Sequence, residues 1–241
     1  MNLFYVENIT GSTAVMSEME SRHCVKSMRL RNGDSIRCTD GNGFLYDGVL
    51  VEDNPKACVI AIRQQTAMPP ELPFHLHIAV AATKNPDRLE WFVEKAVEIG
   101  VTEISIIRCA HSEKESVKTD RMERLMIAAM KQSLRFRLPA FHPAIELQAL
   151  VQQYAPLHDW QKFIAYCGEE NDKQELISLA APQTNSLILI GPEGDFSPDE
   201  VVMAQQSGFR TVTFGSMRLR TETAALYACC QMHFVNELKK K

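Results

Sequence analysis

The alternation of apolar and polar positions changes near residue 66 of the chain. Before that point, short alternating runs such as Ser35–Thr39 and Ala57–Ile62 are separated by turn signals such as Asp40-Gly41-Asn42-Gly43. Alternation with a period of two predicts strands that bury one face, and closely spaced turns favour a small barrel or sandwich. We therefore predict a small β-domain over residues 1–70.

A proline-rich stretch, Thr66–Pro73, follows this region and favours an extended linker. Beyond it, predicted strands alternate with predicted helices. The strands are expected at Phe74–Ala82, Glu103–Ile107, Lys162–Tyr166, Ser186–Ile190 and Thr211–Phe214, and the clearest helices at Pro86–Gly100, with Asn85 as N-cap, and at Thr221–Leu238. Such alternation predicts an α/β domain over residues 74–241 with a mostly parallel sheet.

Composition narrows the class of protein. The 241 residues are 45% hydrophobic and 23% charged, which is typical of a soluble globular protein. The net charge of -4 excludes a sequence-wide polycation, so any contact with nucleic acid must come from local clusters. No apolar run approaches the roughly 20 residues of a membrane span, and the first residues do not resemble a signal peptide. The 7 cysteines lack metal-ligand spacing, which predicts reduced thiols, a cytoplasmic protein and no metal site.

The most informative loop joins the predicted strand ending at Ile190 to a helix that starts at Ser197-Pro198-Asp199-Glu200, where Ser197 as N-cap and Glu200 predict a capping box. Between them lies Gly191-Pro192-Glu193-Gly194, and ligands of α/β proteins bind where a strand end faces a helix N-terminus. Gly191 and Gly194 permit positive φ in this turn and let a ligand approach the backbone. An ordinary tight turn with a solvated Glu193 explains the same residues equally well.

A second segment, Phe214–Ala225, also reads as a strand end, a glycine turn and a helix start, with Thr221 or Thr223 as N-cap. Two such loops at neighbouring strand ends would form the walls of a slot. Neither loop is a phosphate-binding nest, so a nucleoside triphosphate is disfavoured. A carboxylate such as Glu193 or Glu222 suits a cation, and backbone groups can bind an adenine edge. S-adenosylmethionine combines an adenine with a positively charged sulfonium, so it is one candidate ligand for this slot.

Two basic clusters favour RNA as a partner. The segment from Arg22 to Arg37 contains five basic residues and one acidic residue. The segment from Arg108 to Arg137 contains eight basic residues and four acidic residues. Localised positive charge on an acidic protein is what a phosphate-binding surface requires. For any single residue a solvated surface position is the alternative, and His23 is equally consistent with a histidine in a barrel core.

Five segments, taken in order, are similar to one known family. They are Arg22-His23; Met28-Arg29-Leu30-Arg31-Asn32-Gly33-Asp34; Lys84, Asp87, Arg88 and Glu90 followed by Glu94–Val101; Gln132-Ser133-Leu134-Arg135 before Leu138-Pro139; and Ile190-Gly191-Pro192-Glu193-Gly194 with Arg218–Ala224. Together they resemble the RsmE family of small-subunit ribosomal RNA uridine-N3 methyltransferases, within the SPOUT superfamily. The resemblance covers essentially the whole chain.

The chain departs from the family pattern at four positions. The family usually has glycine where this chain has Asp195 and Leu134, glutamate where it has Lys131, and arginine where it has Lys114.

The resemblance implies a SPOUT-type α/β fold: a mostly parallel sheet with a C-terminal trefoil knot over residues 74–241, preceded by a PUA-like β-barrel over residues 1–70. General rules of chain topology would have excluded a knot. It also implies S-adenosylmethionine as cofactor, a specific uridine of 16S ribosomal RNA within the small ribosomal subunit as substrate, and a homodimer with its active site near the subunit interface.

The expected site residues follow from this match. The cofactor-binding residues are Leu189, Ile190, Gly191, Pro192, Glu193, Gly194, Phe214, Gly215, Met217, Leu219, Arg220, Thr221, Thr223 and Ala224. The RNA-binding residues are Arg22, His23, Lys26, Arg29, Arg31, Lys84, Arg88 and Arg135.

Catalysis requires alignment of the methyl donor with uridine N3, and it requires removal of the N3 proton or stabilisation of the uracil anion. We assign Arg220 to stabilising charge on uracil and Glu222 to proton removal or orientation. The structural alternative is that Glu222 complements the helix dipole and pairs with Arg220.

Other functions remain open from the sequence. Within the superfamily, the enzyme could act on another RNA or on a ribose 2′-hydroxyl. A non-catalytic RNA-binding assembly factor is a second alternative, although it would not need intact cofactor loops. A dinucleotide oxidoreductase is disfavoured because the phosphate-binding glycine pattern and its downstream acid are missing.

Overall fold

The computed structural model describes residues 3–112, 117–168 and 174–238. Contacts divide the chain into two compact units. One unit holds residues 1–71 and 127–138, and the other holds residues 72–126 and 139–241. The boundary after residue 71 lies inside the proline-rich stretch, whereas no sequence pattern predicted that segment 127–138 groups with the first unit.

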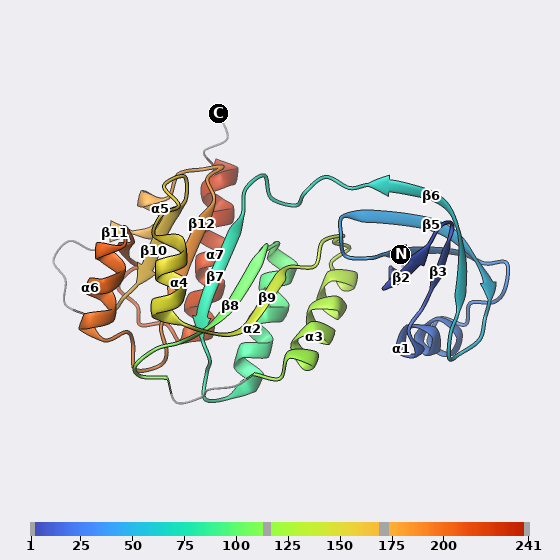
Figure 1. The fold of residues 1–241 in the computed structure, drawn as a ribbon, viewed down its shortest axis with the longest axis horizontal. Helices are drawn as coiled ribbons and strands as arrows, with labels where there is room; N and C mark the ends of the chain where they lie inside the picture. Colours follow the sequence, from blue (N-terminus) through green and yellow to red (C-terminus); the bar gives the residue numbers. More distant parts are fainter. Residues whose placement is uncertain (1–2, 113–116, 169–173, 239–241) are drawn as a thin grey trace. The chain divides into compact units, whose positions relative to one another are not determined.

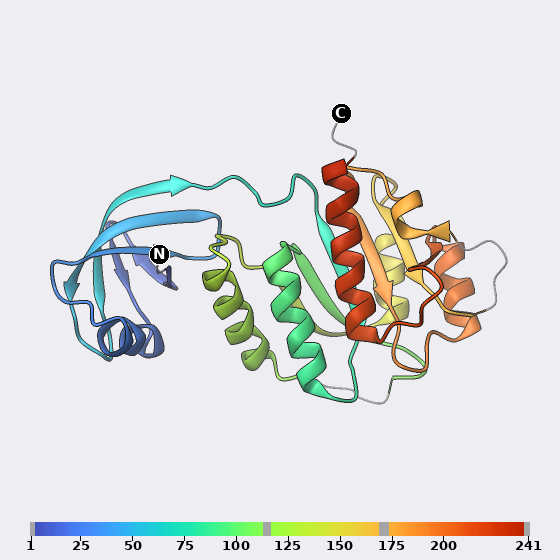
Figure 2. The same cartoon turned by 180° about the vertical axis from the view of Figure 1, so that it is seen from behind.

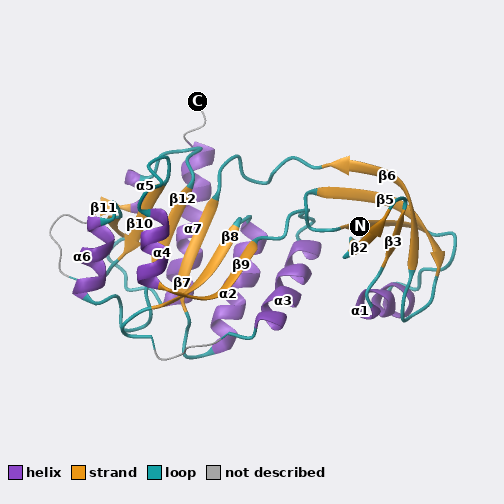
Figure 3. Cartoon of the chain, in the orientation of Figure 1, coloured by secondary structure: helices purple, strands orange, loops and turns teal. Residues whose placement is uncertain are grey.

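The first unit is built on a six-stranded sheet with strand order β1-β4-β5-β6-β3-β2. Its strands are β1 (Phe4–Tyr5), β2 (Asn8–Thr10), β3 (Thr13–Val15), β4 (Ser35–Thr39), β5 (Phe44–Glu52) and β6 (Val59–Ala67). Apart from the parallel β1–β4 pair, neighbouring strands are antiparallel. The long strands β5 and β6 curve strongly (Figure 3), and buried side chains such as Phe4, Leu50 and Ile60 fill the core that they enclose.

A short helix, α1 (Glu18–Arg22), continues into a π-helical turn, η1 (His23–Ser27), beside this sheet. Ser17 caps α1, because its hydroxyl accepts the backbone N–H of Glu20 at 3.3 Å. Cys24 and Val25 are buried in the core, so α1 and η1 are packed onto the sheet by their apolar side.

A buried ion pair joins segment 127–138 to α1. The Lys131 ammonium contacts one carboxylate oxygen of Glu20, a residue that is only 3% exposed. The other oxygen of Glu20 accepts the backbone N–H of Tyr5 at 3.0 Å. Lys131 therefore neutralises a buried carboxylate inside the first unit, which explains a lysine at this position without any contact to RNA.

The second unit contains a seven-stranded sheet with order β11-β13-β10-β12-β7-β8-β9. Its strands are β7 (Leu76–Ala81), β8 (Glu103–Arg108), β9 (Ala140–Glu146), β10 (Gln161–Ala165), β11 (Gln174–Glu175), β12 (Ser186–Ile190) and β13 (Arg210–Thr213). All of its recorded strand pairs are parallel. Every residue of β7 and β12 is buried, as expected for strands covered on both faces.

Helices cover both faces of this sheet (Figures 1 and 2). α2 (Pro86–Ile99) and α7 (Thr221–Leu238) pack side by side on one face, while α4 (Leu147–Tyr154) and α6 (Pro198–Gln206) lie on the other. The remaining helices are α3 (Thr119–Gln132) and the short α5 (Leu176–Leu179). Among the described helices, none combines the length and the apolar character needed to cross a bilayer.

Several local predictions are confirmed at single residues. Asn85 caps α2 by accepting the Asp87 N–H at 2.9 Å, and Gly100 ends that helix with a φ of 100°. Ser197 and Glu200 form the predicted capping box at the start of α6. The sequence missed β9, which contains Pro143 and runs along the edge of the sheet, where a strand can lack an N–H donor.

Histidines gather at the amino ends of the parallel strands, at the opposite edge from the loops that follow β10, β12 and β13. His77 is fully buried between Tyr154 Oη and Ser105 Oγ, each at 2.8 Å, and burial lowers the pKa of His77 to about 4. Burial opposes ionisation of Glu103, but hydrogen bonding to His75 and nearby histidine charges lower its pKa to about 2. The polar side chains at this edge of the sheet therefore satisfy one another's hydrogen bonds and charges.

Candidate active site

A cavity of about 770 Å³ opens at the carboxyl ends of β10, β12 and β13. This volume lies within the ~300–1,000 Å³ range of small-molecule sites in proteins. Three loops wall it: the one after β10, the one after β12 and the one between β13 and α7. The carboxyl edge of a parallel sheet is where α/β proteins bind their ligands, so the cavity is the first candidate for a cofactor site.

The loop after β12 is packed tightly against the core. Gly191 is buried, and a Cβ atom added there would lie 3.1 Å from the ring of Phe196. Its carbonyl accepts a hydrogen bond from the Thr221 hydroxyl at 3.0 Å, which ties this loop to the first turn of α7. Neither Gly191 nor Gly194 uses the positive φ that glycine permits; in this loop the left-handed residue is Asp195, with a φ of 63°. Glycine is thus required at 191 by the close approach of Phe196.

The loop before α7 forms the opposite wall. Gly215 adopts the left-handed region, with a φ of 96°, and its carbonyl accepts the Thr213 hydroxyl at 3.1 Å. Because α7 begins at Thr221, the predicted N-caps Thr221 and Thr223 both lie inside the helix. Thr221 uses its hydroxyl to hold Gly191 instead of capping α7.

The loop after β10 is the part of the cavity that sequence reasoning missed. β10 lies between β12 and β13 in the sheet, so the two glycine loops leave strands that are not direct neighbours. Ala165, Tyr166, Cys167 and Gly168 consequently line the cavity between them. The predicted strand Lys162–Tyr166 ran one residue past the end of β10, and strand order is set by non-local pairing that periodicity does not reveal.

Asp195 connects three of the loops at this edge. One of its carboxylate oxygens accepts the Cys167 N–H at 2.8 Å and the other accepts the Phe196 N–H at 2.9 Å. Its carbonyl oxygen accepts a hydrogen bond from Nδ1 of His111, in the loop after β8, at 3.0 Å. A glycine at this position would keep the left-handed backbone but lose the carboxylate bonds, so Asp195 adds a clamp to the cavity wall.

Most of the predicted cofactor residues line the cavity. These are Ile190, Gly191, Pro192, Glu193, Phe214, Gly215, Met217, Leu219, Arg220, Thr221 and Ala224. Leu189 is fully buried within β12, Gly194 lines a neighbouring cavity, and Thr223 is exposed on α7 outside the lining. Asp195 and Arg218 are lining residues that the sequence prediction did not include.

The predicted catalytic pair is not brought together. Arg220 is exposed and lines the cavity, whereas Glu222 is 7% exposed and is not among its lining residues. Oε1 of Glu222 lies 3.8 Å from Nε of Arg88 on α2, and Oε2 has no hydrogen-bond partner in the described part of the chain. The helical path of α7 turns Glu222 toward α2, which corrects the expectation that it adjoins the reacting atoms beside Arg220.

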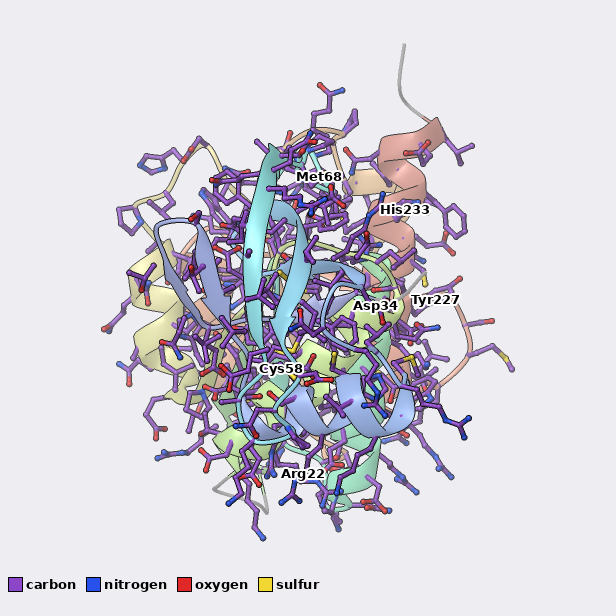
Figure 4. All side chains as sticks on the ribbon, turned by 90° about the vertical axis from the view of Figure 1, so that its right-hand side faces the viewer. Arg22, Asp34, Cys58, Met68, Tyr227 and His233 are labelled. Atoms are coloured by element: carbon purple, nitrogen blue, oxygen red, sulfur yellow. The ribbon has the colours of Figure 1, made fainter. Side chains whose placement is uncertain are left out.

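The predicted RNA-binding residues lie in both units. Lys26, Arg29 and Arg31 are exposed in η1 and the segment after it. Arg22 is exposed on α1 (Figure 4) and pairs with Glu18 at 2.6 Å. His23 is an exposed residue whose ring is tilted against that of Phe4, with the centroids 5.8 Å apart, and is not a core histidine.

Lys84 is exposed before α2, Arg88 faces Glu222, and Arg135 is half-buried with a pKa lowered by burial. In the second basic cluster, Arg108, Arg121 and Lys131 form ion pairs with Glu146, Glu90 and Glu20, while Lys114 lies outside the described residues. Three of the eight basic residues in that cluster are therefore neutralised by carboxylates of the same chain.

Family models match most of the chain. Residues 70–233 match the RNA methyltransferase domain, and residues 18–63 match the RNA methyltransferase PUA domain. The chain belongs to the RNA methyltransferase family. Its curated relatives are named Ribosomal RNA small subunit methyltransferase E, among them the Bacillus subtilis protein, 29% identical over 91% of this chain and 89% of that one. The family resemblance and the PUA-like assignment of the first unit are thus confirmed.

Solved RNA methyltransferases share the fold along the whole chain. A structure described as a "probable rRNA-methyltransferase" from Porphyromonas gingivalis has a TM-score of 0.93 and 36% identity, covering 100% of both chains. Ribosomal RNA small subunit methyltransferase E from Neisseria gonorrhoeae, bound to S-adenosyl methionine, has a TM-score of 0.84 and 24% identity, covering 98% of both. The α/β sheet preceded by a PUA-like unit is therefore the family's architecture.

Proposed function

We propose that this protein transfers the methyl group of S-adenosylmethionine to N3 of one uridine in the RNA of the small ribosomal subunit. One observation carries the proposal: a cavity walled by the Gly191 and Gly215 loops, in a chain of the RNA methyltransferase family. The names of the curated relatives support small-subunit ribosomal RNA as the substrate, and the neisserial structure supports the cofactor.

The cavity suits a nucleoside with a cationic side arm. Ile190, Phe214 and Leu219 supply apolar walls for an adenine, and buried Gly191 brings the backbone close to it. Glu193 contributes negative charge to the lining, which suits a cationic ligand. S-adenosylmethionine, when bound, supplies an electrophilic methyl group.

Arg220 is one of two arginines, with Arg218, among the described residues that line the cavity, and we assign it the role of assisting the acceptor. Its side chain is exposed and belongs to the lining of the cavity. A fixed positive charge stabilises the negative charge that develops on uracil when N3 loses its proton, and such stabilisation is strong where water is excluded. Arg220 thus keeps the role expected from the sequence, whereas Glu222 does not.

The exposed bases of the first unit are proposed to hold the RNA backbone. Lys26, Arg29 and Arg31 lie close together in the chain with Asp34 as the nearby acid, whose carboxylate accepts the Arg31 backbone N–H at 2.7 Å. Phosphate contacts of this kind position the RNA without reading its sequence.

The cysteines of the described residues are all free, which supports a cytoplasmic setting.

A homodimer is part of the same proposal. Tyr227, Phe234 and Leu238 repeat at seven and four residues along α7, so they share one face of the helix, and all three are exposed. Figure 4 shows Tyr227 on α7, and Trp91 on the adjacent α2 is exposed as well. An apolar stripe on a helix layer fits a second copy of this chain.

Phe234→Glu combined with Leu238→Glu is expected to convert a dimer into a monomer, because it places charge in an apolar interface. Light scattering at micromolar concentration reads the mass. Val202→Glu on α6, another exposed apolar side chain, is the matched control and should leave a dimer. A wild-type monomer with full activity would exclude the dimer.

The trefoil knot also remains a proposal. Strand β13 enters the sheet between β10 and β11, and α7 then returns across β12 and β7. Because the chain returns over strands that come earlier in the sequence, this path supports a knot near the cavity.

Methyl transfer to intact small subunits tests the proposed function. Purified protein with radiolabelled S-adenosylmethionine should label the RNA of subunits from cells that lack the enzyme, and subunits from normal cells should accept little label. Calorimetry should show binding of S-adenosylmethionine and not of NAD. Absence of both cofactor binding and labelling would reject the proposal.

A further inference from the structure

Glu193 stands between two cavities. A second cavity, of about 570 Å³, lies beside the loops that follow β7 and β8 and is lined by Lys84, Ala110, His111, Ser112, Glu193 and Gly194. Glu193 is the residue that this second cavity shares with the cofactor cavity. A group transferred from a donor in one cavity to an acceptor in the other would pass this side chain.

The carboxylate of Glu193 is held in place from one side. Its Oε1 accepts the backbone N–H of Lys84 at 3.2 Å. Its Oε2 makes no recorded hydrogen bond to the described residues, and the side chain is exposed. One oxygen is therefore oriented by the chain while the other is available to accept a proton.

The other polar groups of the second cavity match an imide base. Ser112 accepts the Cys109 N–H at 2.9 Å, so its hydroxyl proton can be donated to a carbonyl oxygen of a ligand. Nδ1 of His111 donates to the Asp195 carbonyl, which fixes the imidazole beside the loop that carries Glu193.

Glu222, the base expected from the sequence, lies in the first turn of α7 and does not have this placement. Glu222 is buried against Arg88 and lines neither of the two cavities. Proton removal needs a base within hydrogen-bond reach of the acceptor, so geometry favours Glu193 over Glu222.

We propose that the second cavity receives the acceptor uracil and that Glu193 is the catalytic base for the reaction. The inference rests on the proposed function. The N3–H bond breaks and its proton passes to the Glu193 carboxylate, while the N3 electron pair forms a bond to the methyl carbon. The carbon–sulfur bond breaks, its electron pair returns to sulfur, and the positive charge on sulfur is lost. Because Glu193 is exposed, the proton then leaves to solvent.

Glu193→Gln tests the inference, because the amide keeps the shape and the hydrogen bond from Lys84 but cannot take a proton. The measurement is the single-turnover rate of methyl transfer to deficient small subunits, with cofactor and subunits saturating, over a range of pH. We expect a loss of about 10²- to 10⁴-fold at neutral pH, the usual contribution of a general base. The deficit should shrink as pH rises, because hydroxide then removes the N3 proton.

Controls separate this role from a structural one. Asp199→Asn removes an exposed carboxylate from the first turn of α6 and should keep the wild-type rate. The affinity of Glu193→Gln for subunits should stay near the wild-type value, and saturating S-adenosylmethionine removes any effect of the lost charge in the cavity lining on the measured rate. A Glu193→Gln rate within tenfold of wild type would overturn the inference, as would loss of cofactor binding that accounts for the defect, or a larger loss in Glu222→Gln. An inactive wild-type protein would instead reject the proposed function, and the inference with it.

Discussion

Gly191→Val is expected to weaken the affinity for S-adenosylmethionine by between about tenfold and a hundredfold. A Cβ at this buried position already lies 3.1 Å from the Phe196 ring, and valine adds two methyl groups. Phe196 belongs to the hydrophobic core, so the loop must move instead of the ring. Overpacking strain of about 1–3 kcal/mol corresponds to this loss, at roughly 1.4 kcal/mol per tenfold. Calorimetric titration with the cofactor measures it.

Gly194→Val provides the matched control in the same loop. Its added Cβ would meet the His111 side chain, and Gly194 lines the second cavity but not the cofactor cavity. We expect cofactor affinity close to wild type in this variant, and an intermediate loss in Gly191→Ala. Equal affinities of wild type and a folded Gly191→Val would place the cofactor somewhere else.

Lys131→Glu is expected to destabilise the first unit by about 3–5 kcal/mol, the usual cost of leaving a buried charge without its partner. Glu20 is 3% exposed, and the substitution would set a second carboxylate against it. Hydrogen exchange of amides in β4 and β5 reads the stability of this unit directly. Faster exchange confined to residues 1–71 and 127–138 is the expected result.

Arg22→Glu is the control for Lys131→Glu, because it reverses one charge of an exposed pair on the same short helix. Exposed pairs contribute only about 0–1 kcal/mol, so its effect should be small. Reversing both members, with Glu20→Lys and Lys131→Glu, should recover part of the loss. Equal effects of Lys131→Glu and Arg22→Glu on stability would show that the buried pair contributes no more to the stability of this unit than the exposed pair.

Local signals predicted the elements that local chemistry determines. The runs Ser35–Thr39 and Ser186–Ile190 became strands with the predicted bounds, and α7 spans the predicted Thr221–Leu238. Asn85 capping and the Ser197–Glu200 capping box depend on residues a few positions apart, which is why they could be read from the sequence.

Two departures from the family pattern acquire a structural meaning. Asp195 and Leu134 stand where glycine is usual, and they have φ values of 63° and 54°. The left-handed region explains why glycine is common at both positions. Asp195 offsets the cost of its left-handed backbone by accepting hydrogen bonds from the Cys167 and Phe196 N–H groups. Nothing in the structure explains the leucine at 134.

Non-local arrangement could not be predicted from periodicity. The sequence did not show that β10 inserts between β12 and β13, so the contribution of Tyr166 and Cys167 to the cavity was missed. It also placed Glu222 beside Arg220, because the two are close in sequence. The start of α7 between them turns Glu222 toward Arg88.

Reverse transcription across the RNA of the small subunit tests the central claim most directly. Methylation at N3 removes the donor that pairs with adenine, whereas methylation of a ribose hydroxyl leaves base pairing intact. Subunits from cells lacking the enzyme should be copied without a stop, and treatment with the protein and S-adenosylmethionine should create a stop at one uridine. Arg220→Ala should create that stop poorly. Incorporation of methyl groups with no stop at any uridine would contradict the N3 assignment.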